Sequence, residues 1–355
     1  MYQKFIKTES TAQRCSTMET RDHSKNGASP KSLMSRGNIK YMLLFICLFA
    51  VNAYSQCPFT GNGTQANPWN ISDNTSSGNS VYAYVSGSTL TIYGNGNMAD
   101  FWNSLGGEAP WNNPNCYSNP AAIQTVVFQT GNTITNIGRR AFKGLQNLQG
   151  NIIIPSTVTK INAQAFLNCT HSNFQSITIP ISVIEIEGEA FKSCAAKTIT
   201  IAEGNGNLTF KRPQISGTYY VDWFENCQMQ TLILGRPYTR ESGEPPFKGR
   251  IFLQNLTIGK NVNTLESEAF NNCTNLKNVI IDDHTVELAF SYPSYNDGHF
   301  NGSHIENLYI GRNIKATGGG INVNPFAGNL ASANAIVTIG NDVTAINPNS
   351  FHNCT

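Results

Sequence analysis

Charged side chains are scarce in this sequence of 355 residues: they make up 13% of it, against roughly 25% in an average soluble protein. The formal net charge of +2 provides no basic field, which argues against nucleic acid as a partner. Catalytic motifs are missing as well, because the sequence contains no Gly-x-Ser-x-Gly elbow, no His-Glu-x-x-His pair and no phosphate-cradling glycine loop. We therefore expect a non-enzymatic protein without cofactor or bound metal.

Long apolar runs are also missing, with one exception at residues 42–51 (MLLFICLFAV). Ten residues are too few to span a bilayer. Arg36 and Lys40 precede the run, and Ala53 and Ser55 follow it at the spacing of a small-residue cleavage site. This arrangement predicts a signal peptide and a secreted or cell-surface protein with no membrane insertion after cleavage; an uncleaved anchor is the alternative.

These features divide the chain into four parts. Residues 1–33 are polar and unpatterned and are expected to be a non-native or unstructured extension before a true start at Met34. The signal peptide then covers 34–55, an N-terminal cap region 56–122 and a repeat array 123–355.

What the sequence has in abundance is a repeated motif centred on phenylalanine. Its spacing is close to 24 residues, with two longer intervals of 33 and 30. The anchors are Phe142, Phe166, Phe191, Phe224, Phe247, Phe270, Phe300, Phe326 and Phe351. A unit of this length cannot bury an apolar face alone, so stacked neighbours must share one core.

A short β-branched burst flanks each motif and usually ends in Pro or Gly. The nine bursts are 125–129, 151–155, 176–180, 198–202, 231–235, 255–259, 278–282, 307–311 and 336–340. In 176–180 the period-2 rule points Ile177 and Ile179 inward and Ser176 and Thr178 outward. Second short extended pieces follow at 158–161, 183–186, 262–265 and 343–346. The pattern predicts a solenoid of stacked short parallel strands, with turns and loops on the convex side and little helix.

The repeat closely resembles the BspA-like class of leucine-rich repeat. Residues 158–180 and 262–281 carry its Val-Thr-x-Ile, Ala-Phe-x-x-Cys and strand elements, and 89–111 (TLTIYGNGNMADFWNSLGGEAPW) is similar to the segment that precedes the array in this family. The resemblance covers roughly residues 85–355. It implies a leucine-rich-repeat fold and export or surface display, and several members of the family are adhesins.

The chain departs from the family pattern in several places. Residues 203–222 and 283–299 are interpreted as insertions, and 236–246 as a turn-rich loop in place of the second extended piece. The sequence ends at Thr355 without the strand expected next, so we expect a truncated C-terminus. In the cap, 81–85 and 89–93 predict a small β-hairpin, and Trp102 and Trp111 are expected to plug the first turn.

Cysteine recurs three residues after the anchor phenylalanine, at Cys169, Cys194, Cys227, Cys273 and Cys354. We expect buried free thiols with a packing role at these positions, although a disulfide between Cys169 and Cys194 is conceivable. Zinc is not expected, because no Cys-x-x-Cys pair or nearby His accompanies them. Cys57 and Cys116 bracket the cap, and in an exported chain they are either bridged or free.

Two sets of residues are candidates for binding. The first consists of outward-facing strand positions that carry no charge, including Thr178, Thr200, Thr257 and Tyr309; the alternative is that such side chains simply suit a strand stack. The second consists of aromatics in the irregular loops, which are favoured at binding hot spots but could instead pack those loops down. These are Tyr219, Tyr220, Trp223, Tyr238, Tyr292 and Tyr295.

Together these features predict an exported binding protein of the adhesin type, with a host or neighbouring-cell protein or glycan as its partner. The alternative is a spacer solenoid that displays a further C-terminal domain.

Overall fold

The computed structural model describes residues 56–74, 77–102, 107–212, 222–291, 299–317, 325–326, 329–330, 334–346 and 350–351. The chain divides into two units, Met1–Tyr54 and Ser55–Thr355, and the description below concerns the second. The predicted extension and signal peptide lie outside the described residues. Within the part that is described, no helix is long and apolar enough to cross a membrane.

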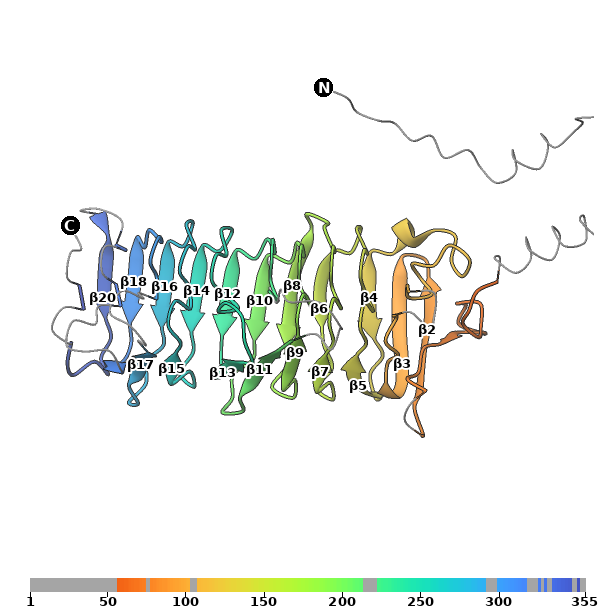
Figure 1. The fold of residues 1–355 in the computed structure, drawn as a ribbon, viewed down its shortest axis with the longest axis horizontal. Helices are drawn as coiled ribbons and strands as arrows, with labels where there is room; N and C mark the ends of the chain where they lie inside the picture. The colour runs from red at the N-terminus through yellow and green to blue at the C-terminus, as the bar shows by residue number, and fades with distance from the viewer. Residues whose placement is uncertain are drawn as a thin grey trace, which may run out of the picture. The chain divides into compact units, whose positions relative to one another are not determined.

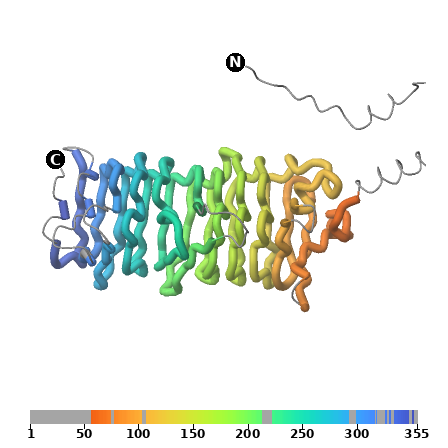
Figure 2. The backbone as a smooth tube through the Cα atoms, viewed as in Figure 1, coloured from red at the N-terminus to blue at the C-terminus, as the bar shows by residue number. Residues whose placement is uncertain are grey.

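The chain coils into a parallel β-solenoid whose turns stack along one axis (Figures 1 and 2). One sheet, which we call the front sheet, has eight parallel strands in chain order. They are β6 (Gly150–Ile153), β8 (Phe174–Ile179), β10 (Thr198–Ile201), β12 (Thr231–Leu234), β14 (Asn255–Ile258), β16 (Asn278–Ile281), β18 (Asn307–Ile310) and β20 (Ile336–Ile339).

The second extended pieces form a back face of two further parallel stacks. One contains β5 (Thr133–Ile137), β7 (Lys160–Ile161), β9 (Glu185–Glu187), β11 (Leu208–Lys211) and β13 (Tyr238–Arg240). The other contains β15 (Thr264–Leu265), β17 (Leu288–Ser291) and β19 (Ile314–Thr317). In the described residues the one helix is a three-residue 3₁₀ turn, η1 (Pro120–Ala122). The predicted solenoid with little helix is confirmed.

The predicted strand register is confirmed as well. Ile199 of β10 lies level with Ile177 of β8 and Leu232 of β12, and all three are fully buried. Thr178 and Thr200 are aligned on the outer side and are half-buried. Inward Ile, Val and Leu side chains therefore form continuous ladders through the stack, as the alternation required.

The anchor phenylalanines stack on one another through the whole array. Successive ring centroids from Phe142 to Phe351 are 5.1 to 5.9 Å apart. From Phe142 to Phe300, the turn after each anchor has a left-handed residue two positions on, such as Asn168 (φ 60°) or Gly249 (φ 71°). Gly, Asn and Ser tolerate this conformation, which explains the recurring Phe-x-Gly, Phe-x-Asn and Phe-x-Ser triplets.

Two expectations about the irregular segments were wrong. The segment 236–246 does not replace the second extended piece, because Tyr238–Arg240 is strand β13 and pairs in parallel with β11. The stretches 203–222 and 283–299 are not insertions throughout, because each contains a regular back-face strand, β11 and β17. The backbone groups of the neighbouring turn offer a ready ladder, and this pairing outweighs the turn-like composition.

In each turn a short segment, which we call the corner, connects the front strand to the back-face strand. The length of this corner varies with a period of three turns. It spans 180–184, 202–207 and 235–237 in three successive turns, and 259–263, 282–287 and 311–313 in the next three. The shortest corner of each set carries a Gly-Arg pair, Gly235-Arg236 and Gly311-Arg312. At Gly235 a side chain would lie 2.6 Å from the Glu203 nitrogen, so only glycine fits this close approach.

The two arginines that follow these glycines are completely buried. Arg236 donates to the carbonyl oxygens of Ile181 (2.7 Å), Val183 (2.6 Å) and Pro180 (3.2 Å), two turns earlier. Arg312 bonds in the same way, also two turns earlier, at 2.8 and 3.0 Å. Each guanidinium thus connects its own corner to the corner two turns earlier through backbone carbonyl oxygens.

The N-terminal cap contains the predicted hairpin, β2 (Ser80–Ser86) paired antiparallel with β3 (Thr89–Asn97), next to the short β1 (Trp69–Asn70). Trp111 is buried and stacks on Phe142, with ring centroids 6.1 Å apart. β4 (Thr125–Phe128), the first of the nine bursts, pairs with β3 and not with β6. A break therefore separates it from the front sheet it was expected to join.

Candidate functional site

The outer side of the front sheet carries two rows of side chains without a single charge. One row runs from Asn151 to Ile336 and the other from Ile153 to Thr338, in the register of the parallel pairs. Ile153 is 74% exposed and Ile280 is 43% exposed. The face is therefore broad, neutral and partly apolar.

Side-chain amides on this face bond to one another along the stack. Asn255 donates to Thr231 (3.3 Å), Asn278 donates to Asn255 (2.7 Å), and Asn307 donates to Asn278 (2.7 Å). The ladder stops there, because the residue level with Asn307 in β20 is Ile336. These amides stabilise the stack itself, which supports the structural explanation for part of this row.

Two hollows open on the same side. The larger, about 470 Å³, lies at the break between β4 and β6 and is lined by Val127, Ile153 and Pro155 among others. The smaller, about 280 Å³, lies over β16, β18 and β20 and is lined by Asn278, Ile280, Asn307, Leu308, Tyr309, Ile336 and Thr338, together with Val279. Both sets of lining residues are uncharged.

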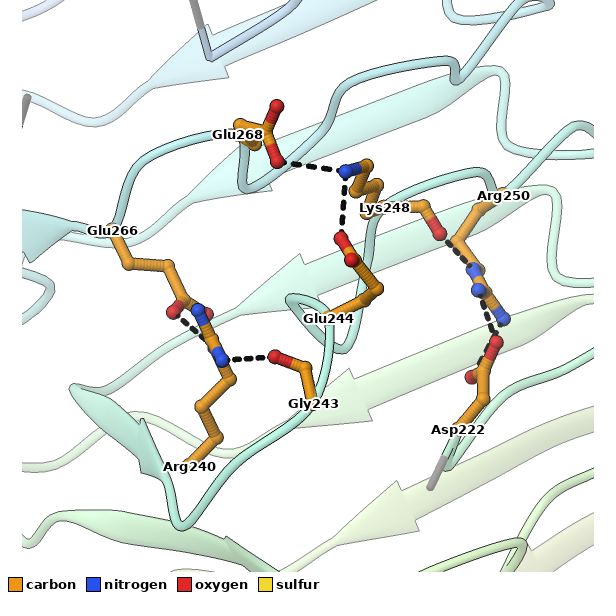
Figure 3. A network of polar contacts seen from close by, with 8 residues as sticks. All are labelled: Asp222, Arg240, Gly243, Glu244, Lys248, Arg250, Glu266 and Glu268. Carbon is orange, nitrogen blue, oxygen red and sulfur yellow. Dashed lines mark hydrogen bonds and ion pairs between the residues drawn. The ribbon is translucent and has the colours of Figure 1, made fainter. Parts of the chain in front are cut away.

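The back face has the opposite character, because it carries charged side chains, several of which pair with each other. Glu185 of β9 bonds Lys160 and Lys211 on the neighbouring strands, each at 2.7 Å. These two lysines lower the pKa of Glu185, outweighing its partial burial. Arg240 of β13 bonds Glu266 at 2.6 Å (Figure 3). A partner on this face would have to displace or desolvate ion pairs.

The edge that carries the phenylalanine turns also holds charged side chains in ion pairs. Lys248 forms ion pairs with Glu244 (2.6 Å) and Glu268 (2.7 Å) (Figure 3). Arg250 forms a bidentate ion pair with Asp222 at 3.1 and 2.6 Å. Arg250 occupies the position that is cysteine in neighbouring repeats. These contacts fasten one turn to the next.

The loop aromatics do not gather at one exposed edge in the part of the chain that is described. Trp223 is fully buried, and its indole N–H donates to the Lys211 carbonyl oxygen at 3.0 Å. Tyr238 packs edge-on against Phe210 and Phe247. Burial, with a contribution from Glu266, raises the pKa of Tyr238 well above its usual value. The prediction that these two side chains emerge for binding was wrong, because Trp223 is fully buried and Tyr238 packs against two phenylalanine rings.

Four further loop tyrosines, Tyr219, Tyr220, Tyr292 and Tyr295, lie outside the described residues, and their binding role stays a prediction. Thr178, Thr200, Thr257 and Tyr309 all lie on the outer side of the front sheet. Sequence reasoning missed the hollow over β16, β18 and β20, although the change from Ile280 to Tyr309 was visible in the row.

The repeat cysteines Cys169, Cys194, Cys227 and Cys273 are buried free thiols; Cys354 lies outside the described residues. The Cys169 thiol donates to the Phe142 carbonyl oxygen at 3.1 Å, and Cys273 donates to Phe247 at 3.2 Å. Burial raises the pKa of Cys169 and of Cys273 to about 12. The ionised thiolate form is therefore disfavoured at these two cysteines. Their hydrogen bonds to the preceding repeat connect neighbouring turns of the solenoid. In the cap, Cys57 and Cys116 form a disulfide.

A buried carboxylate also connects neighbouring turns of the solenoid. Glu187 is 7% exposed; it accepts the Ala163 N–H at 3.0 Å and pairs with Arg139 at 3.8 Å. Burial raises the pKa of Glu187. Among the described residues, no group of three or more His, Cys, Asp and Glu side chains could hold a metal ion.

A coil of short parallel strands with a continuous phenylalanine stack defines a leucine-rich-repeat solenoid. The family model described as BspA type leucine rich repeat region matches in six copies, over residues 113–211, 170–292 and 216–329. These matches cover more than half of the chain, which therefore belongs to the BspA-type leucine-rich repeat family. Proteins of this class are typically binding scaffolds and not enzymes.

Solved structures similar to this chain come from three bacteria. A leucine-rich repeat protein from Eubacterium ventriosum ATCC 27560 is 19% identical, over 80% of this chain and 76% of that one, with a TM-score of 0.38. One from Bacteroides ovatus ATCC 8483 is 17% identical, over 79% and 69%, with a TM-score of 0.31. A leucine rich cell surface protein from Faecalibacterium prausnitzii A2-165 is 14% identical, over 68% and 94%, with a TM-score of 0.23. No curated protein matches the chain.

Proposed function

We propose that this protein is an exported recognition module that binds a protein or glycan on a host or neighbouring cell through the outer side of its front sheet. The observation that carries the proposal is the contrast between the two faces. Two outward rows of the front sheet are free of charge over β6 to β20, whereas the back face holds Glu185, Lys160, Lys211 and their neighbours in ion pairs.

Desolvation favours the front sheet as the contact surface. Burying a neutral apolar and amide surface releases water at little cost, because no ionised group loses its hydration. Ile153 and Ile280, exposed by 74% and 43%, are apolar groups that a partner would cover. Burying the ion pairs of the back face would instead require a compensating charge for each group.

Export is supported by two features of different kinds. The apolar run at 42–51 with its basic and small-residue flanks is typical of a cleaved signal. The disulfide between Cys57 and Cys116 is typical of proteins outside the cytosol. Fractionation of the native cells, with N-terminal sequencing of the mature protein, tests this part: we expect a start at Gln56 outside the cytoplasm. Intact protein in the cytoplasm would refute export.

Binding is tested by screening the secreted full chain against immobilised matrix proteins and glycans. The front-sheet variant Thr200→Arg/Ile280→Arg places two charges on the proposed surface. The matched control, Thr209→Arg/Thr239→Arg, places the same charges on adjacent back-face strands β11 and β13. We expect the front variant to lose about tenfold or more in affinity, because each arginine must be desolvated against the partner, and the control to bind normally.

Equal binding by the front variant and the wild type would overturn the proposed surface. In that case a Tyr219/Tyr220/Tyr292/Tyr295→Ala variant tests the loop aromatics instead. Absence of binding to every partner in the screen would favour the spacer function.

A further inference from the structure

We infer that the small hollow over β16, β18 and β20 is a subsite for a neutral sugar residue, with the Tyr309 ring as its platform and the Asn307 amide as its hydrogen-bonding group. The inference rests on the proposed function, since the hollow is part of the front-sheet surface, and it specifies the partner as a neutral glycan. The hollow measures about 280 Å³, just below the roughly 300–1,000 Å³ of pockets for drug-sized ligands.

Asn307 has hydrogen-bonding capacity left over because it is the last amide of the ladder. Its Nδ2 donates to Asn278 at 2.7 Å, which uses one of two N–H groups. The next residue in the row is Ile336, which has no polar side chain to bond the Asn307 Oδ1. An exposed side chain with one free donor and a free acceptor, held in place by its neighbour, matches two adjacent hydroxyl groups of a sugar.

Tyr309 supplies the flat apolar surface that the C–H face of a sugar requires. It lies level with Ile280 on one side and Thr338 on the other, and its hydroxyl donates to Asp283 at 2.6 Å. That bond fixes the tip of the ring. Gly340 makes room for it, since a side chain there would lie 2.7 Å from the Tyr309 oxygen and 2.5 Å from Asp283.

The charge around the hollow selects against acidic glycans. Its lining is uncharged. Asp283 bonds the Tyr309 hydroxyl at one end, and at the other end Lys277 and Glu306, which precede Asn278 and Asn307, neutralise each other in an ion pair at 2.8 Å. Asp283 accepts the Tyr309 hydroxyl hydrogen bond at 2.6 Å and, with Asp342 and Asp282 nearby, raises the pKa of that hydroxyl, so negative charge lies at this end of the hollow. A uronate or sialate would be repelled here, whereas neutral hexoses would not be.

The test uses the full secreted chain and calorimetric titration with neutral gluco-, manno- and galacto-oligosaccharides, with oligogalacturonate as the acidic comparison. We expect at least one neutral series to bind and oligogalacturonate to bind at least tenfold more weakly. Tyr309→Ala should weaken binding by about tenfold or more, since aromatic stacking is lost. Tyr309→Phe should retain most of it, because the ring remains. Asn307→Ala should weaken binding, and Thr209→Ala, on back-face strand β11, should not.

No binding of any neutral series, or equal binding by the Tyr309→Ala variant, would overturn the inference. These outcomes are distinguishable from failure of the proposed function. If a matrix protein binds and the Thr200→Arg/Ile280→Arg variant loses it while no sugar binds, the front sheet is the recognition surface and the sugar subsite is wrong. If sugars bind equally to that variant and to Tyr309→Ala, both proposals are wrong.

Discussion

The buried His299 makes the stability of the solenoid depend on pH in a predictable direction. Its side chain is fully buried and packs edge-on against Phe290, with ring centroids 4.8 Å apart. Burial lowers the pKa of His299 from 6.5 to about 4. Between these two values the unfolded chain binds a proton that the folded chain does not, so stability is complete above about pH 6.5 and falls as the pH drops towards 4.

The magnitude follows from the separation of the two pKa values. A separation of about 2.5 pH units corresponds to about 3 kcal/mol of unfolding free energy. Replacing His299 by Phe removes the titrating group and keeps an aromatic ring against Phe290. We expect the wild type to lose about 3 kcal/mol more than the His299→Phe variant between pH 7 and pH 4.

Urea titrations followed by circular dichroism at several pH values measure this difference directly. The control His304→Gln removes an exposed histidine and should follow the wild type at every pH. Parallel stability curves for the wild type and His299→Phe would refute the reasoning, because they would mean that His299 is protonated equally in both states.

Three further predictions concern the interior. Phe270→Ala removes one ring from the stack and should destabilise the fold by roughly 3–5 kcal/mol in a urea titration; a loss under 1 kcal/mol would contradict the continuous stack. Arg236→Met removes three hydrogen bonds to backbone carbonyl oxygens and should cost about 2–4 kcal/mol. Arg212→Met, at an exposed site, should change stability by less than about 0.5 kcal/mol. The thiols of Cys169 and Cys273, with pKa values raised to about 12, should react with a thiol reagent at pH 8 only after denaturant is added; rapid reaction in the native protein would contradict their burial.

The strand register could be predicted because it depends on alternation alone. Once Ile177 and Ile179 point inward, the side chains of every equivalent burst must follow, since a shift by one residue would expose the core. The phenylalanine stack was predictable for the same reason, as each repeat must bury its anchor against the next. Phe166 and Phe191, 5.5 Å apart with nearly parallel rings, are an example.

The back-face strand β13 could not be predicted from its own residues. Arg-Pro-Tyr-Thr-Arg-Glu-Ser-Gly reads as a turn, and what makes Tyr238–Arg240 extended is the parallel ladder offered by β11. The loop aromatics were misplaced because tryptophan and tyrosine suit both a binding edge and a core. A signal for Trp223 did exist: it directly precedes an anchor phenylalanine, as buried His299 does three turns later.

The three-turn period also has a signature that sequence reasoning overlooked. Arginine is rarely buried, so composition alone does not predict that Arg236 and Arg312 lie in the interior. Both follow a glycine at the end of a Leu or Ile strand, and both occur one turn after a long corner. Trp223 and His299 occupy matching places beneath Phe210 and Phe290. The array therefore contains two structurally equivalent blocks of three turns.

The most direct test of the recognition surface is a comparison of binding by the two charge variants in one assay. A surface plasmon resonance titration of one partner from the screen against wild type, Thr200→Arg/Ile280→Arg and Thr209→Arg/Thr239→Arg, all with wild-type circular dichroism, separates the front sheet from the back face. A loss of tenfold or more in the first variant alone is the predicted result. Loss in the back-face variant alone, or in neither, would contradict recognition through the front sheet.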